Sequence, residues 1–243
     1  MQFIQKKIKK LLKIICNKMY LKALLKGVAA SVEHESVLKT MNINTIIDIG
    51  GNRGQFSLVA RNIFPNAKII AFEPLKKPFN IFRELFLNDE KVQLYQYALG
   101  HEEGETVMHV SRRDDSSSLL PISKLQESVF PGTNEEYMCN VMVSRLDSII
   151  DFNIIDSPIL LKLDIQGYEY QVLESCVSFI DLFEYIYCEL SFVELYSDQV
   201  LANKIIDFLS LHNIILVGVY NLSYDNQGLA IQGDFLFKKS CHL

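Results

Sequence analysis

The sequence predicts an α/β protein of the doubly wound type, built around a mainly parallel sheet. Short apolar segments rich in β-branched residues recur along the chain, and segments with helical periodicity separate them. These apolar segments lack the polar alternation of a half-exposed strand, so each is expected to be covered on both faces. The first of them ends in a glycine-rich loop, as strands do at the ligand sites of such sheets.

The first 41 residues are expected to form a helical extension ahead of the sheet. A helix is expected over residues 3–26 and a second helical stretch over residues 29–41. Within the first helix, apolar residues recur three or four positions apart, and most lysines fall on the opposite face. The apolar positions are Ile4, Ile8, Leu11, Leu12, Ile15 and Met19. We therefore divide the chain into an extension, residues 1–41, and a main domain, residues 42–243.

Seven strands alternate with helices in the main domain. Strands are expected over residues 45–50, 68–72, 92–98, 159–164, 185–190, 214–220 and 234–237. Helices are expected over residues 55–64, 76–88, 169–180 and 198–212. A turn-rich segment joins the last two strands, so they are expected to pair as an antiparallel hairpin. Residues 100–140 interrupt this order with one short strand, 106–111, and a polar stretch, and such a long insertion is expected to contribute to a ligand pocket.

Charge is distributed unevenly along the chain. Residues 1–32 hold eight lysines and no acidic residue, whereas the whole chain has 24 basic and 29 acidic residues. Because the main domain is acidic, nucleic acid is not expected as a partner. The lysine-rich helix with its apolar stripe is typical of a segment that lies in the interface of an anionic membrane. Packing of the same stripe on the domain or on a second subunit is the alternative, and the oligomeric state stays open.

The compartment is predicted from the cysteines and from the N-terminus. The five cysteines contain no CxxC pair, so neither a zinc ribbon nor a redox motif is expected, and reduced thiols are. Lysines interrupt every apolar stretch near the N-terminus, and no uncharged apolar run is long enough for a membrane span. We expect a cytoplasmic protein, at most peripheral at the inner face of the membrane. The cysteines are Cys16, Cys139, Cys176, Cys188 and Cys241.

The clearest functional motif is the loop Asp48-Ile49-Gly50-Gly51-Asn52-Arg53-Gly54, which joins the first strand to the first helix of the main domain. Gly50 and Gly54 permit a sharp turn and a close approach of a ligand to the backbone. Glu73 ends the second strand, where a carboxylate can accept hydrogen bonds from both hydroxyls of a ribose. The two features together indicate a nucleoside-binding site.

The spacing of the glycines separates two cofactors that would fit these features. A dinucleotide needs the pattern G-x-G-x-x-G so that its pyrophosphate can sit on the helix N-terminus. Counted from Gly50 or from Gly51, the later glycine positions hold other residues. S-adenosylmethionine has no phosphate, and Asp48 and Asn52 offer polar contacts to its methionine part. A nicotinamide-dependent oxidoreductase is therefore disfavoured.

Six segments carry a resemblance to the FkbM family of methyltransferases, over about residues 45–237. The resemblance implies a Rossmann-like class I methyltransferase, with S-adenosylmethionine as cofactor and S-adenosylhomocysteine as product. It also implies O-methylation of a hydroxyl on a saccharide or related metabolite, with residues 100–140 in the acceptor pocket. In this chain it places Asp48, Gly50, Asn52, Gly54, Glu73 and Ala98 at the cofactor and Asp164 beside the sulfonium. The segments are IDIGGNRGQFS (47–57), FEP (72–74), YALG (97–100), SSSLL (116–120), RLD (145–147) and LLKLDIQGYEYQVLES (160–175).

Asp164 is the expected catalytic residue. It follows the fourth strand of the main domain, and ligands in open α/β sheets bind outside the carboxyl ends of strands. A carboxylate there can take the proton of an acceptor hydroxyl or hold that hydroxyl in place. Capping of the next helix or pairing with Lys162 is the structural alternative, and Glu189 and Glu169 are rival bases. No metal site is expected, and the histidines read as helix, loop or tail residues: His34, His101, His109, His212 and His242.

Gln166 departs from the pattern of the family. The usual K-x-D-x-E-G-x-E reads here Lys162-Leu163-Asp164-Ile165-Gln166-Gly167-Tyr168-Glu169, with Gln166 in place of an acid. If that acid orients or deprotonates the acceptor, this chain lacks that option, while cofactor binding should persist. A non-catalytic binding or scaffold protein with a methyltransferase fold is therefore the alternative to an enzyme. The acceptor, and oxygen against nitrogen as its reacting atom, stay open.

Overall fold

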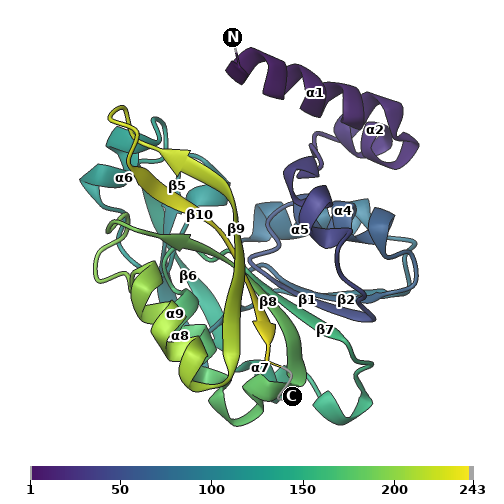
Figure 1. Cartoon of the computed structure of the whole chain (residues 1–243), viewed down its shortest axis with the longest axis vertical. Helices are drawn as coiled ribbons and strands as arrows, with labels where there is room; N and C mark the ends of the chain where they lie inside the picture. Colours follow the sequence, from purple (N-terminus) through teal and green to yellow (C-terminus); the bar gives the residue numbers. More distant parts are fainter. Residues whose placement is uncertain (1, 241–243) are drawn as a thin grey trace.

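The computed structural model describes residues 2–240 and contains two β-sheets with helices packed around them (Figure 1). The main sheet has the strand order β3-β2-β1-β7-β8-β10-β9. Its central strands are parallel, and β10 runs antiparallel to both of its neighbours. This confirms the predicted mainly parallel, seven-stranded sheet with an antiparallel last strand. The strands are β1 Thr45–Ile49, β2 Lys68–Phe72, β3 Val92–Tyr95, β7 Ile159–Leu163, β8 Phe183–Ser191, β9 Ile214–Tyr224 and β10 Ala230–Lys239.

Helices cover both faces of the main sheet, which explains the continuous apolar runs of its strands. Ile47 on β1 packs in a core with residues of the helices α8 and α9, whereas Ile46 packs in a second core with residues of α4 and α5. Successive side chains of a strand point to opposite faces, so both must be apolar in a sheet covered on two sides. The helices are α4 Gln55–Ile63, α5 Lys76–Leu85, α7 Leu146–Ile149, α8 Glu169–Ser175 and α9 Ala202–Leu211.

The N-terminal extension is helical, but it is not one continuous helix. The prediction of a single helix over residues 3–26 is wrong, because Asn17 ends one helix and begins the next. Its side-chain oxygen accepts hydrogen bonds from the backbone N–H groups of Met19 and Tyr20, which caps the second helix. The stretch expected over residues 29–41 is reduced to two short turns. The elements are α1 Gln2–Cys16, α2 Lys18–Leu25, the 3-10 helix Val32–His34 and α3 Glu35–Leu38.

Residues 100–140 are more regular than expected, because they supply most of a second sheet with the order β4-β6-β5. The third strand of the main sheet ends at Tyr95, three residues earlier than expected, and Ala98 begins this second sheet. One face of β5 and β6 is exposed, so their apolar pattern is weaker than that of the buried strands. The elements are β4 Ala98–Leu99, β5 Gly104–Ser111, the 3-10 helix Asp114–Ser116, α6 Lys124–Val129 and β6 Glu135–Ser144.

Smaller differences concern the ends of helices, whereas the described cysteines agree with the expectation of reduced thiols. The helix expected over residues 169–180 ends at Ser175 and continues as a 3-10 helix, Val177–Leu182. A further 3-10 helix covers Phe152–Ile154. Cysteines at positions 16, 139, 176 and 188 are free thiols in the part of the chain that the structure describes. Cys241 and His242 lie outside the described residues.

Candidate functional site

A cavity of about 400 Å³ lies at the carboxyl ends of the central strands of the main sheet. The structure places five of the predicted site residues in its wall: Gly50, Asn52, Glu73, Ala98 and Asp164. They come from the ends of β1, β2 and β7 and from the start of the second sheet. The two other predicted residues, Asp48 and Gly54, stand behind the wall and support the glycine loop.

The glycine loop is pinned between the ends of two strands. The backbone N–H groups of Gly50 and Gly51 both donate to the carbonyl oxygen of Phe72, at 3.1 and 2.9 Å. Gly50 has a φ of +76°, and a Cβ at this position would clash with the carbonyl oxygen of Asp164. A residue with a side chain therefore does not fit, and glycine at this position lets the loop pack directly against the backbone that follows β7.

Glu73 is a buried carboxyl group at the end of β2, held by two backbone donors. Its Oε2 accepts from the N–H of Asn52 at 2.9 Å, and its Oε1 accepts from the N–H of Leu75 at 2.8 Å. Burial raises the pKa of Glu73 to about 8, and the two backbone hydrogen bonds only partly oppose this effect. The geometry leaves a fixed carboxyl facing the cavity, suited to a pair of neighbouring hydroxyls.

Asp48 and Lys162 form a buried ion pair beneath the loop. The Nζ of Lys162 lies 3.1 Å from Oδ1 of Asp48 and donates to the carbonyl oxygen of Gly50 at 3.0 Å. Asp48 also accepts from the hydroxyl of Ser57 at 2.6 Å. Burial alone would lower the pKa of Lys162, but the carboxylates of Asp48 and Asp164 outweigh it, so the pKa is raised. The lysine stays charged and ties the loop to β7.

Gly54 supports the backbone conformation at the start of α4 and is not part of the cavity wall. It has a φ of +86° and immediately precedes α4. A Cβ there would contact the rings of Phe86 and Phe82 at 3.0 and 3.1 Å. A side chain would therefore press on α5 rather than reach the cavity.

Gln166 joins two carboxyl groups across the cavity wall. Its amide nitrogen donates to Oδ1 of Asp164 at 2.7 Å and to Oε2 of Glu189 at 2.8 Å. Its amide oxygen accepts from the hydroxyl of Tyr196 at 2.7 Å. An acid at this position would place a third carboxyl group against the first two, whereas the amide satisfies both. Gln166 thus orients Asp164, whose side chain remains 41% exposed and lies 3.7 Å from Lys162.

The two rival carboxyl groups are more buried than Asp164. Burial and the nearby Asp164 raise the pKa of Glu189 well above its usual range, and Gln232 donates to its second oxygen at 2.9 Å. Glu169 accepts from the N–H groups of Ile165 and Gly167, at 3.1 and 3.0 Å, and burial raises its pKa to about 7. Glu189 lines the cavity, whereas Glu169 holds the loop after β7 from behind.

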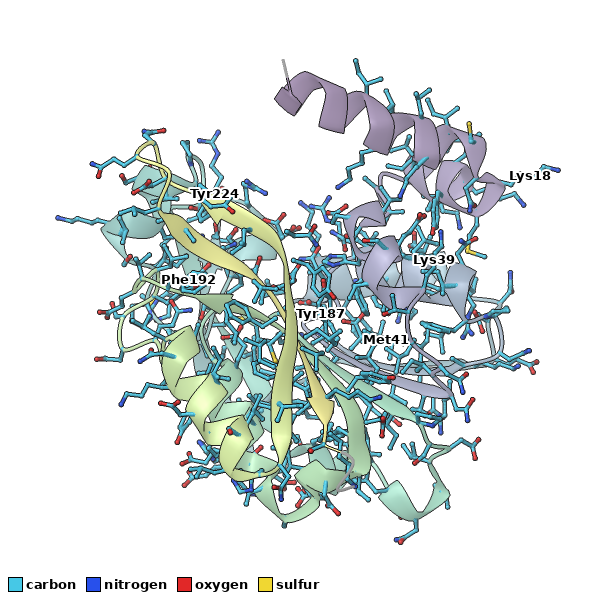
Figure 2. The ribbon with its side chains drawn as sticks, viewed as in Figure 1. Lys18, Lys39, Met41, Tyr187, Phe192 and Tyr224 are labelled. Atoms are coloured by element: carbon cyan, nitrogen blue, oxygen red, sulfur yellow. The ribbon has the colours of Figure 1, made fainter. Side chains whose placement is uncertain are left out.

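His34 and Asp234 also line the cavity, and neither was predicted as a site residue. The Nδ1 of His34 lies 3.0 Å from the hydroxyl of Tyr187 and 3.5 Å from Oδ2 of Asp234. Asn221 donates to the same carboxyl oxygen at 2.7 Å. Figure 2 shows Tyr187 near the middle of the molecule, where the N-terminal extension meets the main sheet. The contact joins residues from opposite parts of the chain, so no local pattern could reveal it.

The insertion closes the remaining side of the cavity. Asp114, Asp115, Ser116 and Ser117 lie in its wall, and the hydroxyl of Ser118 donates to the carbonyl oxygen of Gln166 at 2.7 Å. Within residues 2–240, no three side chains of the kinds that bind metals are grouped to hold an ion. The wall is therefore polar and rich in carboxyl groups.

A comparison of the sequence with known protein families identifies the family to which the chain belongs. Residues 48–216, more than half of the chain, match the Methyltransferase FkbM domain. The chain belongs to the FkbM methyltransferase family. The matched segment contains the glycine loop, Glu73, Asp164 and Gln166, whereas His34 and Asp234 lie outside it.

Three relatives of this FkbM family member have been named as methyltransferases. "Methyltransferase 1" of Beauveria bassiana is 30% identical over 53% of this chain and 56% of its own length. "2-O-methyltransferase NoeI" of Sinorhizobium fredii is 26% identical over 70% of this chain and 72% of its own length. "Methyltransferase sdnD" of Sordaria araneosa is 29% identical over 53% of this chain and 59% of its own length. The chain thus matches little more than half the length of two of the three.

Proposed function

We propose that this FkbM family member uses S-adenosylmethionine to methylate a hydroxyl group on a saccharide or related metabolite. The observation that carries the proposal is Glu73, a buried carboxyl fixed by two backbone N–H groups in the wall of the cavity. A carboxylate at the end of the second strand of such a sheet is suited to the two hydroxyls of a ribose.

The residues of the wall fit the other parts of this cofactor. The loop from Gly50 to Asn52 lines the cavity and offers polar groups to the methionine part, without the glycine spacing of a pyrophosphate site. Ala98 offers a small apolar surface for the adenine. When bound, S-adenosylmethionine supplies a methyl group activated by a sulfonium, so catalysis depends mainly on the alignment of the acceptor.

The polar half of the cavity supports a hydroxyl acceptor. Asp164 is half-exposed and held by Gln166, so its carboxylate can hold an acceptor hydroxyl or take its proton. Asp114 and Asp115 also lie in the wall, and each is paired with an arginine, Arg53 or Arg113. This part of the wall therefore offers polar groups without net charge, which suits a neutral polyhydroxyl compound. The name of the relative NoeI, a 2-O-methyltransferase, agrees with oxygen as the reacting atom.

Replacement of Glu73 tests the cofactor. In Glu73→Ala, affinity for S-adenosylmethionine and S-adenosylhomocysteine is expected to fall by about tenfold or more, because both ribose hydroxyls lose the carboxyl group that binds them. Calorimetric titration of wild type and variant measures the change. Glu105→Ala is the matched control, since Glu105 is an exposed carboxylate on β5 outside the cavity and its loss should leave affinity unchanged.

Other outcomes of the titration would contradict the proposal in distinct ways. Binding of NAD in place of both sulfur compounds would favour an oxidoreductase. Tight binding of S-adenosylmethionine, with no S-adenosylhomocysteine released in the presence of any saccharide acceptor, would favour the scaffold alternative that Gln166 raised.

The raised pKa of Glu73 predicts that binding depends on pH. Below about pH 8 the free protein holds this carboxyl protonated, and above that value it holds the carboxylate that accepts from both hydroxyls. Affinity for S-adenosylhomocysteine should therefore rise by up to about tenfold per pH unit below the pKa and level off above it. Titrations across this range in wild type and Glu73→Gln provide the measurement, and an equally steep rise in Glu73→Gln would assign the effect to another group.

A further inference from the structure

A stripe of apolar side chains runs along the outer surface of the N-terminal helices. Ile8, Leu11, Leu12 and Ile15 on α1 are 52%, 50%, 55% and 48% exposed, and Met19 continues the stripe on α2. Their spacing of three or four residues puts them on one side of the helix. Figure 1 shows α1 and α2 standing at one end of the molecule, apart from both sheets. The exposed fractions show that the stripe does not pack on the rest of the chain.

The opposite side of α1 is held to the body of the protein. Lys10 and Lys13 form ion pairs with Glu33 and Glu35, with N–O distances of 2.9 and 3.0 Å, and the neighbouring Ile14 is buried. An amphipathic helix that merely covered its own domain would turn its apolar stripe inward. Here the charged side faces the protein, and the apolar side is presented outward.

The positive charge around the apolar stripe favours a negatively charged surface as its partner. The first 32 residues contain eight lysines and no acid, and Lys18, Lys22 and Lys26 on and after α2 are exposed. In Figure 2 the side chain of Lys18 points away from the body. A second copy of this surface would bring two strongly basic segments together, whereas anionic lipid headgroups attract them. We propose that α1 and α2 bind the surface of an anionic lipid bilayer.

The helices would lie in the membrane interface. No helix in residues 2–240 is both long and apolar enough to cross a bilayer. An apolar stripe flanked by lysines suits a helix whose apolar side enters the boundary between headgroups and acyl chains. The proposal is independent of the proposed function, because cofactor binding in solution does not require these helices to be on a membrane.

The stripe is tested by a triple variant, Leu11→Gln/Leu12→Gln/Ile15→Gln, in the full chain. Wild type is expected to sediment with vesicles of phosphatidylcholine mixed with phosphatidylglycerol, and much less with phosphatidylcholine alone. The variant should bind the mixed vesicles at least about tenfold more weakly. The matched control is Ile154→Gln/Leu211→Gln/Leu229→Gln, which removes three apolar side chains elsewhere that are even more exposed and should bind as wild type.

Tryptophan fluorescence can report whether α1 enters the membrane interface. The chain contains no tryptophan of its own, so a single introduced indole gives the whole signal. In Leu12→Trp the new indole is expected to shift its emission to shorter wavelength on mixed vesicles and to be quenched by brominated acyl chains. In Leu211→Trp, on the exposed side of α9, emission should not change.

Three results would overturn the proposal: no binding of wild type to the mixed vesicles, equal binding by wild type and the stripe variant, or unchanged emission from Leu12→Trp. A stable dimer in sedimentation equilibrium that the stripe variant abolishes would instead assign the surface to a second copy. Affinity of the stripe variant for S-adenosylhomocysteine in solution should equal that of wild type, which shows that the variant remains folded.

Discussion

Gly50→Ala is expected to destabilise the protein by about 3 kcal/mol or more and to abolish cofactor binding. Two effects add at this position. The backbone has a φ of +76°, which disfavours any residue with a Cβ, and that Cβ would clash with the carbonyl oxygen of Asp164. The clash is with backbone at the end of β7, so relief requires movement of a central strand. Urea denaturation gives the change in free energy of unfolding.

Gly228→Ala separates these two effects. Gly228 has a φ of +85° in the turn between β9 and β10, and a Cβ there would meet nothing within 4 Å. Gly228→Ala should therefore lower the free energy of unfolding only through the strain of a left-handed backbone conformation, by about 1–2 kcal/mol. Equal losses of unfolding free energy in Gly50→Ala and Gly228→Ala would show that the close approach of the loop to Asp164 adds nothing to the cost of a Cβ.

Lys162→Met is expected to cost about 3–5 kcal/mol of stability, because it leaves the carboxylate of Asp48 buried without its cation. The lysine is almost fully buried, and its Nζ contacts both Asp48 and the carbonyl oxygen of Gly50. Asp48→Asn in the Lys162→Met background should recover part of the loss, since the orphaned charge is removed. Urea denaturation of the four proteins in this cycle measures the coupling.

Lys238→Met is the matched control. Lys238 also pairs with a carboxylate, Glu184, and also lies 5.5 Å from the centre of an aromatic ring, as Lys162 does. Its side chain is 40% exposed, however, so its removal should cost no more than about 1 kcal/mol. A comparable loss in both lysine variants would contradict the role of the buried pair.

The fold could be predicted where the signal is local. The buried strands β1, β2 and β7 are short, apolar and followed by glycine or acidic residues, so both their type and their order were clear. The break between α1 and α2 was missed because a helix-capping asparagine fits inside an otherwise regular helical pattern. The second sheet was missed because β5 and β6 each begin with four consecutive exposed residues, so the alternation expected of a half-buried strand is absent there.

The site residues likewise divide into those that a local sequence pattern predicts and those that only the complete fold brings together. Gly50 and Glu73 lie at the ends of predicted strands, where chain order alone brings them to one edge of the sheet. The contact between His34 and Asp234 joins the N-terminal extension to β10, and it exists only after the whole sheet has formed. Gln166 could be recognised as unusual from the sequence, but its two hydrogen bonds to carboxyl groups required the position of β8.

The place of β10 in the main sheet has a consequence for synthesis on the ribosome. β9 emerges first, yet it pairs with β10, and β10 in turn pairs with β8. β9 must therefore wait outside the sheet until its successor has been translated and inserted. Gln232 and Asp234 of β10 complete the cavity wall, so the nascent chain cannot use a bound ligand to stabilise itself until about residue 239 has left the exit tunnel.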